Sequence, residues 1–355
     1  MKTFVILNRF SDERGIPLKK VTMADVAKLA NVSKSTVSQY LNKRYEYMSE
    51  ETRKRIARAI EELGYQPNII ARSLKQKTTM TIGVIVFNLL HMLTTQVLHA
   101  IEEACQERGF HVIVSNSDDD PEKEKKYIEM LRAKQVDGLI IFPTGKNADV
   151  YQKMTEERFP LVFVDRMVPG VKADAVLLDN QKAAALAVEY FAERGYERIG
   201  VVAPPPVSHI IPRMERIEGF RQALAKKGLP VVDDYFITTE IPRIQKELTR
   251  LFASGRLPEA LFAINDLTLM EVLYFVKGNH IKIPDELAII SIDDVPFAHV
   301  YTPTLTTIAQ PTFAMGKKAA ERLFLQIAKK SEHQPQVFRF SPTFIERGSA
   351  KEKTS

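Results

Sequence analysis

The chain is poor in the residue types on which disulfide frameworks and metal centres depend. Its 355 residues include one cysteine, Cys105, so no internal disulfide can form. Its seven histidines are scattered along the chain and form no cluster with metal-ligand spacing. We therefore expect no metal and no cofactor, and we interpret Cys105 as a buried thiol.

The sequence also lacks the signals of common enzyme classes and of membrane insertion. No G-x-S-x-G, Walker A, HExxH or dinucleotide-binding fingerprint occurs, so nucleophilic, phosphoryl-transfer and hydride chemistry have no visible anchor. No apolar run reaches the length of a membrane span, and residues 1–20 lack the apolar core and cleavage site of a secretory leader. We expect a cytoplasmic protein that is not an enzyme.

Positive charge is concentrated at one end of the chain. Residues 1–80 contain 16 Lys and Arg against 8 Asp and Glu, a net charge of +8, whereas the remaining 275 residues contain 34 against 36, a net charge of −2. The whole surplus of +6 therefore lies in the first 80 residues, as expected of a surface that neutralises DNA phosphates.

This basic end has the capping pattern of three short helices. Thr22 and Asp25 have the spacing of a capping box that opens the first helix. Ser33 is predicted to cap the second helix and Ser49 the third, which ends at Gly64. A generic three-helix bundle has similar caps, but together with the charge the pattern favours a helix-turn-helix DNA reader.

Beyond Thr78, short apolar runs alternate with amphipathic helices, as in parallel α/β sheets. Buried strands are predicted at residues 81–87, 111–115, 138–142, 161–164, 199–202, 260–264 and 287–292, with a helix at 122–134. About 270 residues exceed the usual size of one core, so we expect two doubly wound parallel-sheet subdomains.

Three consecutive aspartates, Asp118 to Asp120, precede the proline that starts the helix at 122–134. Acidic residues at this position favour the amino-terminal end of the helix dipole. We prefer this interpretation to a metal site.

Six motifs, in order and spacing, resemble those of the LacI/GalR family of bacterial transcription regulators. They are residues 21–38, residues 64–68 with 71–74, residues 216–220, 265–266, 293–294 and 302–307. The resemblance covers the chain from Val21 to about Gly348. It implies an α-helical helix-turn-helix headpiece and a bilobed α/β core similar to periplasmic sugar-binding proteins.

The resemblance also implies a domain organisation. We expect an extension at 1–20, a helix-turn-helix domain at 21–66, a hinge helix and linker at 67–79, a core at 80–348 and a tail at 349–355. The first lobe of the core is expected at about 80–177 and 311–339, and the second at about 178–310 and 340–348. The tail lacks the leucine-heptad helix of tetrameric relatives, so we expect a homodimer and a palindromic operator.

By the same resemblance, the second helix enters the major groove of double-stranded operator DNA. Lys34, Ser35 and Gln39 are expected at base edges, where their side chains suit hydrogen bonding to bases. The other expected contacts in the headpiece are Thr22, Ser33, Thr36, Ser38 and Asn42, the last three as phosphate positioners. In the hinge helix they are Asn68, Ala71 and Leu74, with Leu74 wedged between bases.

Strand ends and the resemblance together predict an effector site in the cleft between the lobes. The candidates are Phe87, Asn88, Thr144, Asp165, Arg166, Arg213, Arg216, Asn265 and Asp293. Carboxylates and amides suit sugar hydroxyls, whereas arginine suits a carboxylate or a phosphate. The three arginines favour an acidic sugar, although Arg166 has Asp165 beside it as an alternative partner.

Matches at residues 45–49 and 121–138 are most similar to regulators of 2-keto-3-deoxygluconate use in Gram-positive bacteria. We therefore expect a repressor of a sugar-acid catabolic operon that this small acidic sugar releases from DNA. The absence of an aromatic residue near Thr239 is evidence against a nucleobase effector. Open alternatives are a family member that responds to a phosphosugar or a protein co-regulator and, from another class, a sugar-binding protein or a sugar-acid enzyme.

Overall fold

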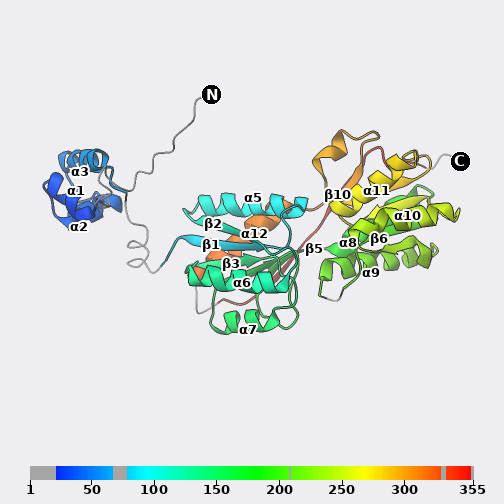
Figure 1. The fold of residues 1–355 in the computed structure, drawn as a ribbon, viewed down its shortest axis with the longest axis horizontal. Helices are drawn as coiled ribbons and strands as arrows, with labels where there is room; N and C mark the ends of the chain where they lie inside the picture. Colours follow the sequence, from blue (N-terminus) through cyan, green and yellow to red (C-terminus); the bar gives the residue numbers. More distant parts are fainter. Residues whose placement is uncertain (1–20, 67–77, 208, 329–332, 353–355) are drawn as a thin grey trace, which may run out of the picture. The chain divides into compact units, whose positions relative to one another are not determined.

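The computed structural model describes residues 21–66, 78–207, 209–328 and 333–352. The chain divides into two compact units, residues 1–79 and 80–355 (Figure 1). Each unit has a hydrophobic core of its own.

The described part of the first unit contains α1 (Met23–Leu29), α2 (Lys34–Leu41) and α3 (Glu50–Leu63). Ser33 Oγ accepts the N–H of Thr36 at 3.1 Å, and Ser49 Oγ accepts the N–H of Thr52 at 3.3 Å. Both predicted caps are therefore present, and α3 ends as predicted at Gly64, which has a left-handed φ of 58°.

The predicted capping box at the start of α1 is also confirmed. The Asp25 carboxylate accepts the backbone N–H of Thr22 at 2.8 Å and its hydroxyl at 2.7 Å. Val26, Val37 and Ile56, one from each helix, are fully buried and pack in one cluster. The caps thus fix the helix starts, and this small core holds the three helices together.

The second unit is built on two six-stranded sheets. The first has the order β11-β5-β4-β3-β1-β2, and its strands are all parallel. They are β1 (Thr81–Val86), β2 (His111–Asn116), β3 (Gly138–Ile141), β4 (Leu161–Val164), β5 (Asp174–Leu178) and β11 (Val337–Phe340). One face is covered by α5 (Met92–Gln106) and α12 (Thr312–Ala328), and the other by α6 (Pro121–Ala133) and α7 (Ala148–Glu156).

The second sheet has the corresponding order β12-β10-β9-β8-β6-β7. Its strands are β6 (Ile199–Ala203), β7 (Phe236–Thr238), β8 (Ala260–Ala263), β9 (Ala288–Ile292), β10 (Thr306–Ala309) and β12 (Thr343–Ile345). One face packs on α8 (Asn180–Glu193) and α9 (Ile211–Lys226), and the other on α10 (Ile244–Ala253) and α11 (Asp266–Gly278). Short 3₁₀ turns lie at η1 (Asp233–Tyr235), η2 (Ile241–Arg243) and η3 (Pro296–His299).

One strand corrects the expectation of two parallel sheets. Strand β12 pairs antiparallel with β10, whereas the other described pairs of the second sheet are parallel. Only two residues separate β11 from β12, so the chain leaves the first sheet at its carboxyl edge and enters the second at the facing carboxyl edge. A strand that enters from this side must run opposite to its neighbour.

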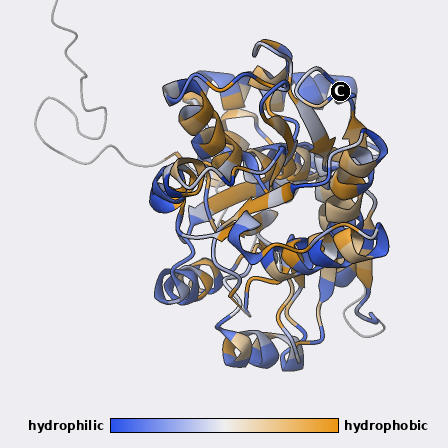
Figure 2. Ribbon diagram, turned by 90° about the vertical axis from the view of Figure 1, so that its right-hand side faces the viewer, coloured by the Kyte–Doolittle hydropathy of each residue, from blue (hydrophilic) through white to orange (hydrophobic). Residues whose placement is uncertain are grey.

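The strands form the interior of each lobe, which explains their continuous apolar sequences. Figure 2 shows hydrophobic colour on the central strands and a mixture of hydrophobic and hydrophilic colour along the helices. Where α12 crosses α5, a Cβ atom on Gly316 would lie 2.6 Å from the Val97 carbonyl oxygen, so glycine permits the close approach.

Candidate effector site and DNA-binding helices

The carboxyl edges of the two sheets carry an aspartate at equivalent positions. Asp165 follows β4, and Asp293 follows β9, the strand at the same place in the second sheet. Both have a left-handed backbone, with φ of 64° and 81°. Their N–H groups bond to the next strand, at Val176 O (2.9 Å) and Ile308 O (3.0 Å). Left-handed backbone is uncommon outside glycine, and here it occurs twice beside one cavity.

This cavity lies between the lobes and is lined by seven of the nine predicted effector residues: Phe87, Asp165, Arg166, Arg213, Arg216, Asn265 and Asp293. The remaining lining residues are His91, Leu93, Ile210, Pro212, Ile264 and Gln310. The cavity volume is about 40 Å³, far below the roughly 300–1,000 Å³ typical of small-molecule sites. A sugar-sized ligand therefore requires the lobes or their side chains to move apart.

Two predicted effector residues do not line the cavity. Thr144 is buried and donates two hydrogen bonds to the Glu124 carboxylate, from its backbone N–H at 2.7 Å and from its hydroxyl at 2.9 Å. Asn88 Oδ1 accepts the N–H of Leu90 at 2.8 Å and so shapes the turn after β1. Both follow strands, as predicted, but local hydrogen bonds turn them to structural partners.

Arg166 is held mainly by a residue that strand ends did not indicate. Its Nη1 lies 2.6 Å from Asp119 Oδ1, whereas its Nε lies 3.6 Å from Asp165 Oδ2. The guanidinium also lies 4.2 Å from the centroid of the Phe87 ring, within cation–π distance. The expected alternative, a pair with Asp165, is therefore the weaker of two ion pairs.

The three aspartates before α6 have three different roles. Asp120 caps the helix and accepts the N–H of Glu122 at 2.8 Å. Asp118 forms an ion pair with Lys123 at 2.6 Å, and Asp119 forms an ion pair with Arg166 in the cavity wall. The Asp119 side chain thus has a partner in the cavity wall that the dipole interpretation did not include, and the left-handed backbone at 118 and 119 turns the chain between β2 and α6.

Arg213 and Arg216 reach the cavity from α9, where they lie in the first and second turns. Arg216 Nε donates to Asn180 Oδ1 at 2.8 Å, and its Nη1 donates to the Ile264 carbonyl at 2.7 Å. Arg213 Nη2 lies 4.0 Å from Asp119 Oδ2. Burial and the neighbouring Arg166 lower the pKa of Arg213. These two arginines bring positive charge to the second lobe's side of the site.

Burial also changes the acidity of the two equivalent aspartates. It raises the pKa of Asp165 above its ordinary value, against the opposing charges of Arg166 and Arg216. Burial raises the pKa of Asp293 as well, and the nearby Asp266 carboxylate adds to that effect. A bound cationic or hydroxyl group would relieve the desolvation of either carboxylate.

A hydrogen-bonded pair that sequence reasoning missed connects the two lobes. Asp266, the first residue of α11, lies 2.8 Å from His91 Nδ1 and accepts the N–H of Met92 at 2.8 Å. A carboxylate of the second lobe thus occupies the start of α5 in the first lobe. Burial acts to raise the pKa of Asp266. The hydrogen bond from His91, the charge of His91 and hydrogen bonds from two backbone N–H groups act in the opposite direction, and the pKa of Asp266 is lowered below its ordinary value.

Gln310 and Asn265 complete the polar wall near Asp293. Gln310 Nε2 donates to Asp293 Oδ1 at 2.7 Å. Asn265 is the N-cap of α11, and its Oδ1 accepts the N–H of Thr268 at 2.9 Å. Gln310 directly follows β10, so the rule of strand ends would have found it if β10 had been predicted.

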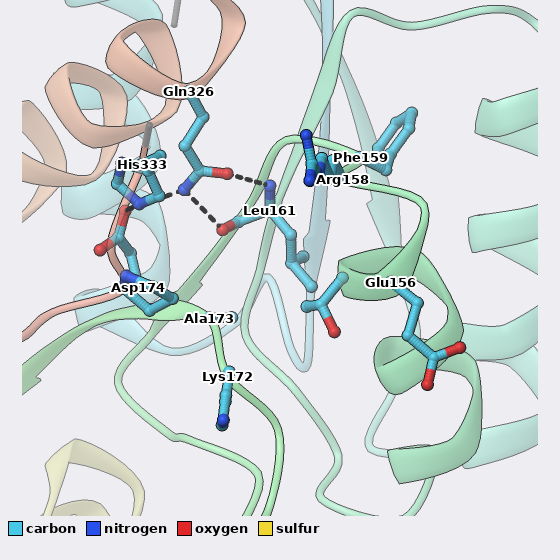
Figure 3. Close-up of a pocket in the computed structure, with 11 residues that line it drawn as sticks. Glu156, Arg158, Phe159, Leu161, Lys172, Ala173, Asp174, Gln326 and His333 are labelled. Carbon is cyan, nitrogen blue, oxygen red and sulfur yellow. Dashed lines mark hydrogen bonds and ion pairs between the residues drawn. The ribbon is translucent and has the colours of Figure 1, made fainter. Parts of the chain in front are cut away.

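A larger cavity, of about 440 Å³, lies at the opposite edge of the first sheet, near the starts of β4 and β5 (Figure 3). Its buried carboxylate, Asp174, already accepts hydrogen bonds from Arg322, Gln326 and the backbone N–H of Gln336 at 2.8–3.2 Å. His333 Nε2 lies 2.7 Å from the same carboxylate. This network ties α12 to β5 and the segment before β11, so we assign it a structural role.

Helix α2 presents the residues predicted to read bases. Lys34, Ser35 and Gln39 are exposed, while Val37 faces the core. Thr36 and Ser38 are half-buried at the flanks, and Asn42, the exposed C-cap residue, donates its Nδ2 to Ser38 O at 2.7 Å. The exposed N-cap Ser33 lies 2.5 Å, hydroxyl to hydroxyl, from Ser35. Thr22 is the N-cap of α1.

The predicted hinge contacts Asn68, Ala71 and Leu74 lie outside the described residues. Within the described ranges, no helix has the length and apolar character needed to cross a membrane. The same ranges hold no group of three or more potential ligands for a metal ion.

Two family models match the chain. The model for bacterial regulatory proteins of the lacI family matches residues 22–68, and a periplasmic binding protein-like domain matches residues 188–350. These matches fall on the helix-turn-helix unit and on most of the second lobe.

Curated relatives match over nearly the whole chain. "Probable HTH-type transcriptional regulator EndR" of Paenibacillus polymyxa is 45% identical, over 92% of this chain and 98% of its own. The HTH-type transcriptional regulator KdgR of Bacillus subtilis is 31% identical, over 92% and 97%. The HTH-type transcriptional repressor PurR of Vibrio cholerae is 30% identical, over 94% and 99%.

Solved structures show the same fold. The lac repressor dimer bound to operator and the anti-inducer ONPF has a TM-score of 0.81 at 23% identity, over 94% of this chain and 100% of that one. The CelR–cellobiose complex has a TM-score of 0.68 at 24% identity, over 93% and 99%. In that lac repressor structure the protein is a dimer bound to operator and to an anti-inducer. The chain belongs to the LacI family of bacterial regulatory proteins and is a helix-turn-helix transcriptional repressor.

Proposed function

We propose that a small acidic sugar, with 2-keto-3-deoxygluconate favoured, binds between the lobes and releases this repressor from the operator of a sugar-acid catabolic operon. The observation that carries the proposal is that the Arg213 guanidinium has only a distant carboxylate partner within the described part of the chain. Among the described residues its nearest carboxylate oxygen is that of Asp119, 4.0 Å away, whereas Arg166 lies 2.6 Å from the same carboxylate group. Arg213 is therefore the cavity arginine best placed to bind a ligand carboxylate.

Arg216 supports the same proposal. A guanidinium has five N–H donors, and the two hydrogen bonds of Arg216 within the described part of the chain occupy Nε and one N–H of Nη1. The remaining donors suit the oxygen atoms of an acidic ligand. Asp165, Asp293 and Gln310 supply acceptors in the same cavity, as sugar hydroxyl groups require.

The names of the relatives point to more than one effector class. KdgR supports a sugar acid, whereas PurR points to another ligand. One face of the Phe87 ring is already covered by Arg166 at 4.2 Å, which argues against stacking of a purine on that face. An acidic sugar fits the combination of arginines and hydroxyl acceptors better.

On the DNA side, we propose that Lys34, Ser35 and Gln39 read bases and that Thr22, Ser33, Thr36, Ser38 and Asn42 support binding to a palindromic operator. Residues 67–79 would form the hinge segment of each subunit in a cytoplasmic homodimer. The protein acts by binding and not by turnover.

Effector and operator are linked through the lobes. If the ligand binds the state with low operator affinity 100-fold more tightly than the other state, the coupling free energy is about 2.7 kcal/mol. Lobe movement on ligand binding would displace the hinge segments that pair on DNA. A coupling free energy of this size suffices for induction only when the repressor concentration does not greatly exceed the dissociation constant for the operator.

Calorimetric titration of the full-length protein tests the ligand class. We expect micromolar binding of 2-keto-3-deoxygluconate and weaker binding of gluconate, galacturonate and glucose 6-phosphate. Preference for glucose 6-phosphate would support a phosphosugar effector instead. Absence of binding by all four would overturn the sugar-acid proposal and direct attention to a protein co-regulator, while the family assignment would stand.

Replacing Leu74 by Ala tests the proposed hinge contact. Loss of a side chain that wedges between bases should weaken specific operator binding about tenfold or more and leave nonspecific binding nearly unchanged. Fluorescence anisotropy with operator and scrambled duplexes measures both. Equal weakening of the two would count against the wedge.

A further inference from the structure

A series of hydrogen bonds joins the two lobes where the polypeptide crosses between them. Arg339 lies on β11, the edge strand of the first sheet, and Glu215 lies on α9 in the second lobe. Arg339 Nη2 donates to Glu215 Oε1 at 2.7 Å, and its Nη1 donates to Glu215 Oε2 at 3.1 Å. The same Nη1 donates at 3.3 Å to the carbonyl oxygen of Leu178, the last residue of β5 before the crossover. This bidentate ion pair is therefore anchored at the crossover itself.

Asn180 continues the series into the interior of the second lobe. It is the first residue of α8 and is 1% exposed. Its Nδ2 donates to Glu215 Oε2 at 2.9 Å, and its Oδ1 accepts a hydrogen bond from Arg216 Nε at 2.8 Å. A flipped amide would place its oxygen against the Glu215 carboxylate and its N–H groups against the Arg216 guanidinium. Glu215 thus fixes the orientation in which Asn180 accepts from Arg216.

Arg216 is the buried end of the series and lines the cavity between the lobes. Within the described ranges, its second hydrogen bond runs from Nη1 to the Ile264 carbonyl at 2.7 Å. Because the guanidinium is rigid and planar, contacts at Nε and Nη1 determine where its remaining N–H groups point. Loss of the contact with Asn180 would leave only one of these two fixed points.

The ion pair that begins the series lies close to the surface. The side chain of Arg339 is 42% exposed and that of Glu215 is 19% exposed. The hydrogen bond from Glu215 raises the pKa of Arg339, so the guanidinium remains charged. Pairs with this degree of exposure contribute little to folding stability. The fold should therefore tolerate substitution of either residue, and an effect on ligand binding can be measured separately.

We propose that Glu215 and Arg339 are positioning residues that act through Asn180 to hold Arg216 in the orientation that binds a ligand carboxylate. This inference rests on the proposed function of the cavity and extends it to two residues that do not line the cavity. Because Arg339 belongs to the first lobe, the orientation of a ligand-binding arginine in the second lobe depends on the edge strand of the first.

Glu215→Leu tests the inference by calorimetric titration of the full-length protein with two probes, 2-keto-3-deoxygluconate and its uncharged methyl ester. The wild type should bind the acid about 10- to 100-fold more tightly than the ester, since hydrogen bonds to charged groups are the stronger kind. Glu215→Leu should lower the affinity for the acid about tenfold and leave the affinity for the ester within about twofold, because the acid alone pairs its charge with Arg216.

Conservative variants separate positioning from a general structural role. Glu215→Gln keeps an oxygen that accepts from Asn180, so it should retain most of the preference for the acid. Arg339→Met should reduce the affinity for the acid only about threefold, because Glu215 keeps its bond to Asn180 but loses its ion pair. Both variants also report if Glu215→Leu fails to fold. Glu218→Leu is the matched control, because Glu218 is exposed on the same helix and bonds to Gln222 at 2.7 Å.

A double-mutant cycle with Arg216→Ala identifies the route of the effect. If Glu215 acts through Arg216, Glu215→Leu should cause no further loss of affinity for the acid when Arg216 is already alanine. Additive losses in the double variant would overturn the inference.

The outcomes distinguish this inference from the proposed function. Equal losses for acid and ester in Glu215→Leu would show a general structural role and overturn the inference, as would an unchanged preference for the acid; the effector class would stand in both cases. A wild type that binds acid and ester equally would remove the carboxylate contact and the inference with it. If the wild type binds neither probe while operator binding is intact, both the effector class and this inference fail.

Discussion

The two lobes place an aspartate at the same point of the same fold but surround it differently. Asp165 and Asp293 share a left-handed backbone, a hydrogen bond to the neighbouring strand and a raised pKa due to burial. Asp293 accepts hydrogen bonds from Gln310 and from the backbone N–H of Asp266, whereas Asp165 has an ion pair at 3.6 Å. The backbone conformation repeats in the two lobes, but the carboxylate of the second lobe is held by two hydrogen bonds and that of the first by a longer ion pair.

The largest effect is expected from Arg216, the more deeply buried of the two arginines that the second lobe brings to the cavity. Arg216→Ala should weaken binding of the acidic effector more than 100-fold, because it removes a buried donor and leaves Asn180 Oδ1 and the Ile264 carbonyl without it. Operator affinity without ligand should remain within a few-fold of wild type. Anisotropy titrations with operator, with and without effector, measure both. A variant that still responds normally would remove Arg216 from the site.

The two aspartates should differ in their contribution to ligand binding. Asp293→Asn should weaken effector binding about tenfold or more, because a fixed carboxylate binds a hydroxyl with less loss of freedom. Asp165→Asn should weaken it only a few-fold, since its carboxylate has looser contacts. Parallel calorimetric titrations give the comparison. Equal losses, or a larger loss for Asp165→Asn, would contradict the distinction between the lobes.

A smaller effect is expected where the lobes meet. Asp266→Asn should weaken the bonds to His91 and Met92, because the amide is uncharged and accepts with one oxygen only. The distance distribution between spin labels at Lys126→Cys in the first lobe and Lys246→Cys in the second, both exposed positions, should broaden.

Pulsed electron spin resonance on the full-length protein measures these distances. Cys105 is buried, and burial raises its pKa to about 11, so it should not compete for the label. Asp285→Asn, an exposed carboxylate of the same lobe, is the control. An unchanged distribution in Asp266→Asn would show that this contact does not restrain the lobes.

The pH dependence of stability gives the smallest effect. Because burial raises the pKa of Asp165 in the folded protein, its contribution favours folding at low pH and is lost as the pH rises through the folded-state pKa. Asparagine does not titrate, so Asp165→Asn does not lose this stability as the pH rises. The difference in free energy of unfolding, variant minus wild type, should therefore increase between pH 4 and pH 7. Each pKa unit corresponds to about 1.4 kcal/mol. Urea unfolding at several pH values tests this, and a constant or falling difference would contradict it.

Features set by neighbouring residues were predictable from the sequence. Ser33, Ser49 and Gly64 lie where their chemistry starts or ends helices, and long apolar runs marked the central strands. Strand β5, which is buried throughout, was not predicted, and the short strands β7, β10, β11 and β12 were missed as well. Strand β11, for example, alternates between exposed and half-buried residues at the edge of its sheet.

The candidate site was predictable where it depends on strand ends and not where it depends on distant loops. Asp165, Asp293 and Asn265 follow predicted strands, and the structure places them on one cavity. Asp119 meets Arg166 across 47 positions, and His91 meets Asp266 across 175. The first pair arises from loop packing within the first lobe and the second from contact between the lobes, and no local spacing encodes either.

The most direct test of the central claim is operator affinity of the full-length protein as a function of 2-keto-3-deoxygluconate concentration. Linkage requires the operator dissociation constant to rise with ligand and level off, and the operator to weaken ligand binding by the same factor. The predicted factor is about 100, with no response in Arg216→Ala. An operator affinity that stays constant while the sugar binds would contradict control of this repressor by an acidic sugar.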